Sequence, residues 1–132
     1  MNFEKAEIFL KAADHLAYVT YPLTKDKNLL KKIFENLEAS IENILNFSEM
    51  KEETIKKEFS RMLDEKEINK LLEMAEILKR KKSSTVEFLR KNQLVWMDEN
   101  LKSSAISLEE LKEYIRLTKK ILIKLKTDKY IK

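Results

Sequence analysis

The chain has 132 residues, a length typical of one domain with its own hydrophobic core, and we expect a single domain over residues 1–132. It contains no glycine, no cysteine and one proline, which excludes disulfide frameworks, thiolate metal sites and glycine-dependent phosphate-binding loops. The net charge is +4 and no apolar run is long enough to cross a membrane, so we expect a cytoplasmic protein without a membrane partner.

The first predicted helix covers residues 2–21 and carries apolar side chains at helical spacing. The stripe consists of Ala6, Phe9, Leu10, Ala13, Leu16 and Ala17, with a second row expected to widen the buried side: Ile8, Ala12 and Val19. Proline lacks a backbone N–H and disfavours a helical residue before it, so we expect Pro22 to end this helix, with Tyr21 extended. His15 falls opposite the stripe, and we expect it on the surface or at an interface.

A second helix is predicted to begin after a cap at Thr24 or Asp26 and to run to about residues 48–51. Its apolar seam alternates spacings of four and three, a pattern typical of a long helix packed against near-parallel neighbours. The seam residues are Leu30, Phe34, Leu37, Ile41 and Ile44. Asn36 and Asn43 share one face, and we expect them to be buried and to fix the helix register by hydrogen bonds.

Two later helices are indicated by their capping residues. Asp64 and Glu67 have capping-box spacing and predict a helix that runs to about Lys82. Ser107 and Glu110 have the same spacing and predict the start of the last helix. Before Asp64, apolar residues at helical spacing predict one or two further helical turns: Ile55, Phe59, Met62 and Leu63.

Residues 83–106 break the helical pattern, with short apolar runs on both sides of residues 98–101. We expect a small hairpin or an ordered loop there. Asn100 is the expected left-handed turn residue, because asparagine tolerates that conformation better than most residues with a Cβ atom. The predicted fold class is all-α: a four- to five-helix bundle with a short hairpin or ordered loop before the last helix.

A basic segment with a nearby aromatic residue predicts a nucleic-acid contact. Cations offset phosphate charge, and an exposed tryptophan can stack on an unpaired base. The candidate residues are Lys79, Arg80, Lys81, Lys82, Arg90, Lys91 and Trp96, and the last helix adds Arg116, Lys119, Lys120, Lys124 and Lys126. The alternative is that the cations complement the dipole of a helix end and that Trp96 belongs to the core.

No residue pattern predicts catalysis, a metal or a cofactor. Carboxylate metal sites in helical bundles use Glu-x-x-His motifs, and the sequence contains none. A general base needs an orienting acid and a nucleophile or water, but Asp14 points away from His15 along the helix and Lys11 precedes it by one turn. We therefore expect no catalytic residue, no metal and no cofactor, which favours a non-enzymatic protein.

Several stretches of the chain share their pattern with a known family: residues 6–16 (AEIFLKAADHL), 29–30 (LL), 35–37 (ENL) and 85–91 (TVEFLRK). In these stretches the chain resembles HEPN-like helical domains, particularly uncharacterised archaeal members. The resemblance implies a compact bundle of four or five helices that pairs as a homodimer. Many members of this family act as RNases or toxins, or occur beside nucleotidyltransferases.

Active HEPN RNases carry an arginine followed four to six residues later by a histidine on a late helix. After Arg90, residues 91–97 contain no histidine. No histidine follows the other arginines either, namely Arg61, Arg80 and Arg116. The resemblance thus implies a member without catalysis that acts by homodimerisation and by binding RNA or a protein. Two alternatives stay open: nucleic-acid binding through residues 79–91 and the last helix, and an RNase- or toxin-related domain.

Overall fold

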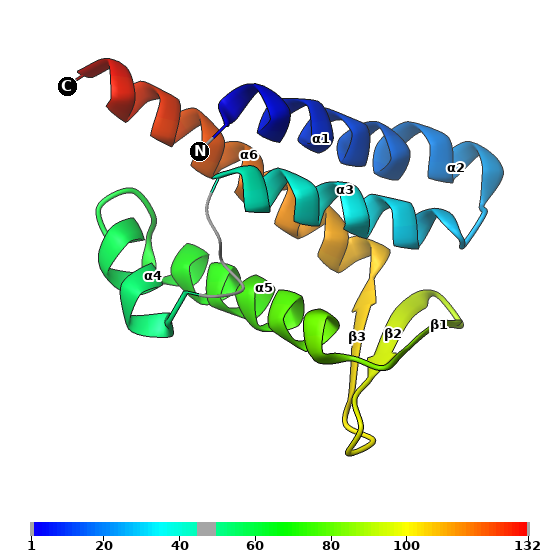
Figure 1. Cartoon of the computed structure of the whole chain (residues 1–132). Helices are drawn as coiled ribbons and strands as arrows, with labels where there is room; N and C mark the ends of the chain where they lie inside the picture. The colour runs from blue at the N-terminus through cyan, green and yellow to red at the C-terminus, as the bar shows by residue number, and fades with distance from the viewer. Residues whose placement is uncertain (1, 45–49, 132) are drawn as a thin grey trace.

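The computed structural model describes residues 2–44 and 50–131 of the chain (Figure 1). Its helical elements are α1 (Phe3–His15), the π-helical segment η1 (Leu16–Thr20), α2 (Tyr21–Thr24), α3 (Leu29–Ile44), α4 (Glu52–Phe59), α5 (Glu65–Ser83) and α6 (Leu108–Ile131). Three antiparallel strands form a sheet in chain order: β1 (Val86–Arg90), β2 (Gln93–Met97) and β3 (Ser103–Ser107). The chain is therefore mostly helical, and the all-α prediction is wrong for the segment that contains the sheet.

The apolar runs on both sides of residues 98–101 form β2 and β3, which confirms the expected hairpin, and β1 is the strand that the sequence did not indicate. β1 and β2 read VEFLR and QLVWM, rich in the branched and aromatic residues that suit strands. β3 reads SSAIS and has one such residue, Ile106, which is fully buried in the core. The strand is therefore held by the burial of Ile106 and by pairing with β2, and not by residue propensity.

The helix that begins with α1 continues through η1 and α2, past Pro22 (Figure 1). Tyr21 is helical, with φ −61° and ψ −46°, and its N–H donates to the carbonyl of Leu16, five residues back. The prediction that Pro22 ends the helix is thus wrong. In a regular α-helix the proline ring would clash with the carbonyl of Tyr18, and the wider π turn relieves this clash. The helix ends instead at Lys25, which is left-handed with φ 56°.

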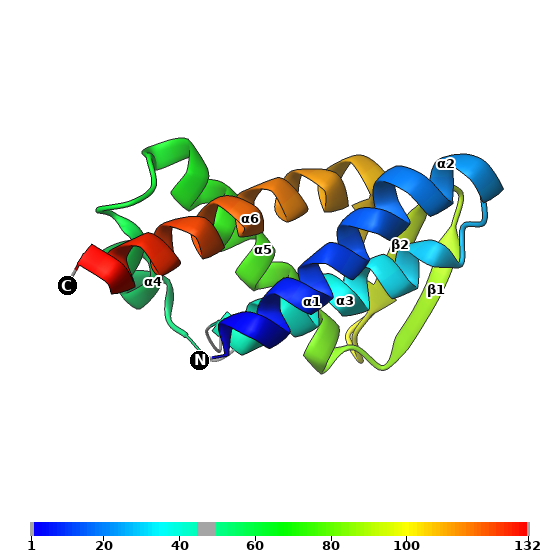
Figure 2. The same ribbon diagram turned by 90° about the horizontal axis from the view of Figure 1, so that it is seen from above.

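Helices α1 and α3 pack side by side, and α6 lies against both (Figures 1 and 2). Their buried side chains belong to one cluster that also takes in residues of α4, α5, β2 and β3. The predicted seam of α3 is confirmed, since all five of its residues are buried: Leu30, Phe34, Leu37, Ile41 and Ile44. Where α1 meets α3, the buried hydroxyl of Ser40 donates to the carbonyl of Ala6 at 2.7 Å.

The predicted role of the two asparagines of α3 is wrong. Neither Asn36 nor Asn43 is buried. Their side-chain amides donate to carbonyls of the same helix, those of Lys32 and Ala39, both at 2.8 Å. They therefore fix no register between helices. Ser48, where we expected this helix to end, lies outside the described residues.

Both predicted capping boxes are confirmed. At the start of α5 the Asp64 carboxylate accepts from the Glu67 N–H at 2.8 Å, and the Glu67 carboxylate accepts from the Asp64 N–H at 3.0 Å. At the start of α6 the Ser107 hydroxyl oxygen accepts from the Glu110 N–H, and the Glu110 carboxylate accepts from the Ser107 N–H, both at 3.2 Å. These bonds satisfy N–H groups that have no partner inside the helix.

The turns of the sheet place left-handed residues where the sequence did not indicate them. Leu101, with φ 62°, takes the conformation that we expected of Asn100. The N–H of Asn100 instead donates to the Asp98 carboxylate at 2.9 Å, and the N–H of Lys102 donates to the same oxygen at 3.0 Å. In the turn between β1 and β2 the left-handed residue is Lys91, with φ 55°.

Candidate functional site

The cations at the end of α5 are engaged in ion pairs with α3. Lys81 Nζ lies 2.6 Å from Glu38 Oε1, and Lys82 Nζ lies 3.3 Å from Glu42 Oε1. These four residues line an open hollow of about 540 Å³ between the two helices. The carboxylates already offset the positive charge that a nucleic-acid phosphate would have to meet. The ion pairs that line this hollow therefore hold α3 and α5 together, and they leave little positive charge free to bind a nucleic acid.

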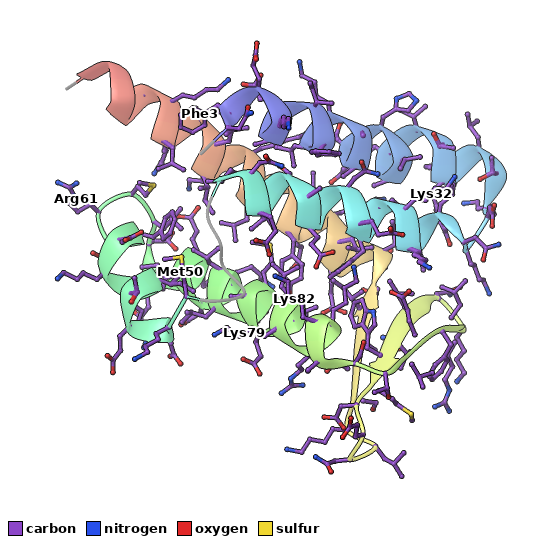
Figure 3. All side chains as sticks on the ribbon, in the orientation of Figure 1. Phe3, Lys32, Met50, Arg61, Lys79 and Lys82 are labelled. Atoms are coloured by element: carbon purple, nitrogen blue, oxygen red, sulfur yellow. The ribbon has the colours of Figure 1, made fainter. Side chains whose placement is uncertain are left out.

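The two cations that precede them on α5 also have partners within the chain. Lys79 Nζ donates to the carbonyl of Met50 at 2.9 Å, and both residues are labelled in Figure 3. Arg80 Nε lies 3.2 Å from Glu76 Oε1, and its Nη1 donates to the hydroxyl of Ser104 on β3 at 3.1 Å. The predicted basic segment 79–82 thus serves mainly to connect α5 to its neighbours.

Trp96 lies in the core, which corrects the expectation of a stacking aromatic. Its side chain is 1% exposed, and its ring centroid lies 4.8 Å from that of Phe34 on α3. Its indole Nε1–H donates to Glu87 Oε1 at 2.8 Å, and the other carboxylate oxygen of Glu87 lies 3.4 Å from Lys31 Nζ. A nucleic-acid base cannot reach this ring while the chain is folded.

The remaining predicted contacts, Arg90 and Lys91, lie at the other end of β1 from α5 (Figure 1). Both are exposed, and neither forms an ion pair within the part of the chain that the structure describes. The structure therefore does not bring the seven predicted residues together. It separates them into a neutralised group on α5, a buried tryptophan and an exposed pair at a turn.

The cations of α6 are likewise paired, mostly with α1 and with the start of α5. Lys119 Nζ lies 2.6 Å from Asp14 Oδ1, and Lys126 pairs with Glu7. The contacts of the other α6 cations are Lys120 with Glu67, Lys124 with the carbonyl of Met62, and Arg116 with the hydroxyl of Tyr18. The hydrogen bond from Lys120 lowers the pKa of the Glu67 carboxyl below its usual value. The basic side chains of α6 thus connect this helix to neighbouring segments of the same chain.

The outer side of the long N-terminal helix carries an exposed apolar stripe. Ile8, Val19 and Leu23 are 65%, 45% and 81% exposed. We expected Ile8 and Val19 to be buried, and this prediction is wrong. The side of the helix that faces the core presents mainly small residues, with Ala6, Ala13 and Ala17 all fully buried. A helix with an alanine face packs closely on its neighbours, which leaves the large side chains of the opposite face in solvent.

The π-helical segment changes where Leu23 lies relative to Ile8. In an ideal α-helix, Leu23 would be rotated by about 60° from Ile8 around the axis, because each residue turns by about 100°. The segment η1 has bonds that span five residues and therefore turns more slowly per residue. The extra residue of this turn removes about 100° of rotation, so Leu23 lies within about 40° of Ile8, on the same side of the helix. We call Ile8, Val19 and Leu23 the outer stripe.

No catalytic arrangement surrounds the single histidine. His15 is exposed and, within the described residues, forms no side-chain hydrogen bond or ion pair. Across residues 2–44 and 50–131, no group of three His, Cys, Asp or Glu side chains is placed to hold a metal ion. No helix in the same ranges is long and apolar enough to cross a membrane.

Comparison of the chain with protein-family models, with curated proteins and with solved structures finds no match. The function of the chain is therefore inferred from its own residues. Two surface features have no role inside the fold: the outer stripe and the exposed end of the sheet around Arg90 and Lys91.

Proposed function

We propose that this chain is a non-catalytic, HEPN-like cytoplasmic protein that acts as a homodimer and binds another macromolecule. The observation that carries the proposal is the outer stripe, whose Leu23 is 81% exposed and whose Ile8 is 65% exposed. Large apolar side chains aligned on the solvent side of a helix usually indicate a contact surface. His15 has no side-chain partner among the described residues, and no arginine is followed four to six residues later by a histidine, which supports a role without catalysis.

The charges around the outer stripe favour a second copy of the chain as its occupant. Glu4 lies at one end of the stripe beside Lys5, whereas Lys25 and Lys27 flank Asp26 beyond the other end, and all five are exposed. Two helices packed antiparallel would place Ile8 of one copy against Leu23 of the other. The same arrangement brings the acid of each copy near the two lysines of its mate, whereas a parallel arrangement brings like charges together.

A two-fold axis is the simplest symmetry for such a contact, because the same patch serves both subunits. The middle of the stripe falls between His15 and Leu16, so the axis would pass near His15. The ion pairs of Lys81 and Lys82 and the burial of Trp96 favour a protein over a nucleic acid as the further partner.

Sedimentation equilibrium at tens of micromolar tests the proposal directly. We expect a dimer that dissociates on dilution, since a stripe of three apolar residues per subunit makes a small interface. A monomer at all concentrations up to about 100 µM would contradict homodimerisation.

A further inference from the structure

A groove beside the open edge of β1 has no role in the fold or in the proposed dimer. It measures about 520 Å³ and lies between the first turns of α3 and the sheet. Its walls are Asn28, Lys31, Lys32 and Glu35 on one side and Glu87, Phe88, Leu89 and Leu94 on the other. Lys32 is labelled on α3 in Figure 3, at the end of the molecule where the helix begins.

The edge of β1 offers unpaired backbone groups to this groove. Strand β1 has β2 as its neighbour on one side, and no strand among the described residues pairs with its other side. Alternate residues of an edge strand turn their N–H and C=O groups away from the sheet, where another extended chain can bind them. The groove therefore combines a hydrogen-bonding edge with an apolar floor that contains Leu89 and Leu94.

The lining of the groove carries two lysines and two glutamates, and further positive charge lies beside it at Arg90 and Lys91. Glu87 is already held by Trp96 and Lys31. Lys32, Arg90 and Lys91 are exposed and form no ion pair with any described residue. The loop between α2 and α3 lies at the same end of the molecule (Figures 1 and 2), and its exposed cations Lys25 and Lys27 belong to the proposed dimer contact. Of the acids there, Glu35 faces Lys32 across one turn, and Asp26 caps the N–H of Asn28.

We propose that this groove binds an extended, acidic segment of a partner protein, which adds to β1 as a fourth strand. Main-chain hydrogen bonds to the strand edge would give affinity, and alternate apolar side chains would lie on the floor. Acidic side chains between them would point to the opposite face of the sheet and meet Arg90 and, at the turn, Lys91. This site is separate from the outer stripe and does not depend on dimerisation.

The same features argue against the other occupants. A second copy of the chain, joined edge to edge through β1, would bring its cations against those of the first copy. A nucleic acid would use the cations but would leave both the strand edge and the apolar floor without a partner. The acidic extended peptide is the one occupant that uses all three features.

The test uses the full chain and a fluorescein-labelled peptide of nine residues that alternates valine and glutamate. We expect saturable binding by fluorescence anisotropy, and slower hydrogen exchange of the amides in residues 86–90 when the peptide is bound. A peptide with proline at every second position lacks the backbone donors and should bind at least tenfold more weakly. The variant Arg90→Glu/Lys91→Glu should lose at least tenfold in affinity.

The matched control is Lys57→Glu/Lys66→Glu, which makes the same change in net charge on exposed residues of α4 and α5. It should bind the peptide within about twofold of the unmodified chain, and circular dichroism should show that both double variants fold. Absence of peptide binding at 1 mM, or equal losses in the two double variants, would overturn the proposal. So would groove-dependent binding of a single-stranded oligonucleotide without binding of the peptide.

Discussion

Glu87 accepts a hydrogen bond from the buried indole of Trp96 at 2.8 Å and at the same time forms an ion pair with Lys31 at 3.4 Å. One carboxylate therefore joins β1, β2 and α3. The indole N–H is buried with its ring against Phe34 and has this carboxylate as its acceptor. This arrangement makes Trp96 a structural residue that anchors the sheet to the helices.

Replacing Glu87 by alanine should lower the free energy of unfolding by about 1–3 kcal/mol, because a buried donor loses its acceptor. Glu87→Gln keeps an acceptor oxygen and should lose less than half as much. Trp96 is the only tryptophan, so its fluorescence during urea unfolding reports the change directly. Equal stability of the alanine variant and the unmodified chain would show that the indole does not depend on this bond.

Replacing Leu23 by lysine should abolish the proposed dimer without affecting the fold. Leu23 is 81% exposed, so its substitution should change the stability of the monomer by less than about 0.5 kcal/mol. Sedimentation equilibrium measures the loss of the dimer. Leu101→Lys is the control, since Leu101 is 76% exposed in the turn between β2 and β3, away from the outer stripe. Loss of the dimer in both variants would contradict the proposed interface.

Single cysteines can report the direction of the two helices, because the chain contains no cysteine of its own. In the antiparallel arrangement, His15→Cys lies near the axis and should form an intersubunit disulfide under mild oxidation. Leu23→Cys should not, because its copies would be about 22 Å apart along the helix axis. Non-reducing electrophoresis separates the outcomes. Cross-linking at both positions would indicate a parallel pair.

At position 25, the left-handed position at the end of α2, glycine should make the fold more stable than lysine does. Lys25 has φ 56°, a conformation that costs a residue with a Cβ atom roughly 1 kcal/mol and that helix ends usually assign to glycine. Lys25→Gly should therefore raise the free energy of unfolding by about 0.5–1 kcal/mol. Thermal unfolding followed by circular dichroism measures this change in stability. Lys11→Gly, exposed within α1, should lower stability by about 1 kcal/mol and serves as the contrast.

The chain should lose stability in acid through the ion pairs of α6. The hydrogen bond from Lys70, at 2.7 Å, lowers the pKa of the Glu113 carboxyl below its usual value of 4.5. At pH values between the lowered pKa of Glu113 in the folded chain and its usual value of 4.5, the unfolded chain binds more protons than the folded chain. The free energy of unfolding therefore falls as the pH drops below about 4.5. Melting temperatures from pH 7 to pH 3 should fall less steeply in Glu113→Gln. Glu109→Gln, an exposed control on the same helix, should follow the unmodified chain.

Local chemistry made the helices and their starts predictable from the sequence. The capping pairs Asp64–Glu67 and Ser107–Glu110 form the expected reciprocal bonds, because such bonds involve residues only three positions apart. The α3 seam is buried as expected, since a heptad pattern is a property of the helix itself. Periodicity also indicated correctly where the helical pattern breaks, but it did not indicate how many strands form there.

Features that depend on distant contacts were not predictable. The apolar row with Ile8 and Val19 had the spacing of a core row, and its exposure follows from α3 and α6 packing on the alanine side of α1. Lys81 and Lys82 looked available because their carboxylate partners lie on α3, some forty residues earlier in the chain. Trp96 is likewise buried against Phe34, which is too far away in the sequence for a local pattern to indicate the contact.

The segment η1 also fixes the length of the chain between Leu16 and Thr20. A π-helical turn holds one residue more than the α-helical turn that it replaces. Deleting one residue there would restore a regular helix and would leave the residues beyond it in about the same orientation, because the π turn covers one turn of the helix with one residue more. Pro22 would then meet the carbonyl that the wider turn now keeps away, since a proline ring in a regular helix clashes with the carbonyl four residues before it. Substitutions within this stretch should therefore be tolerated far better than deletions.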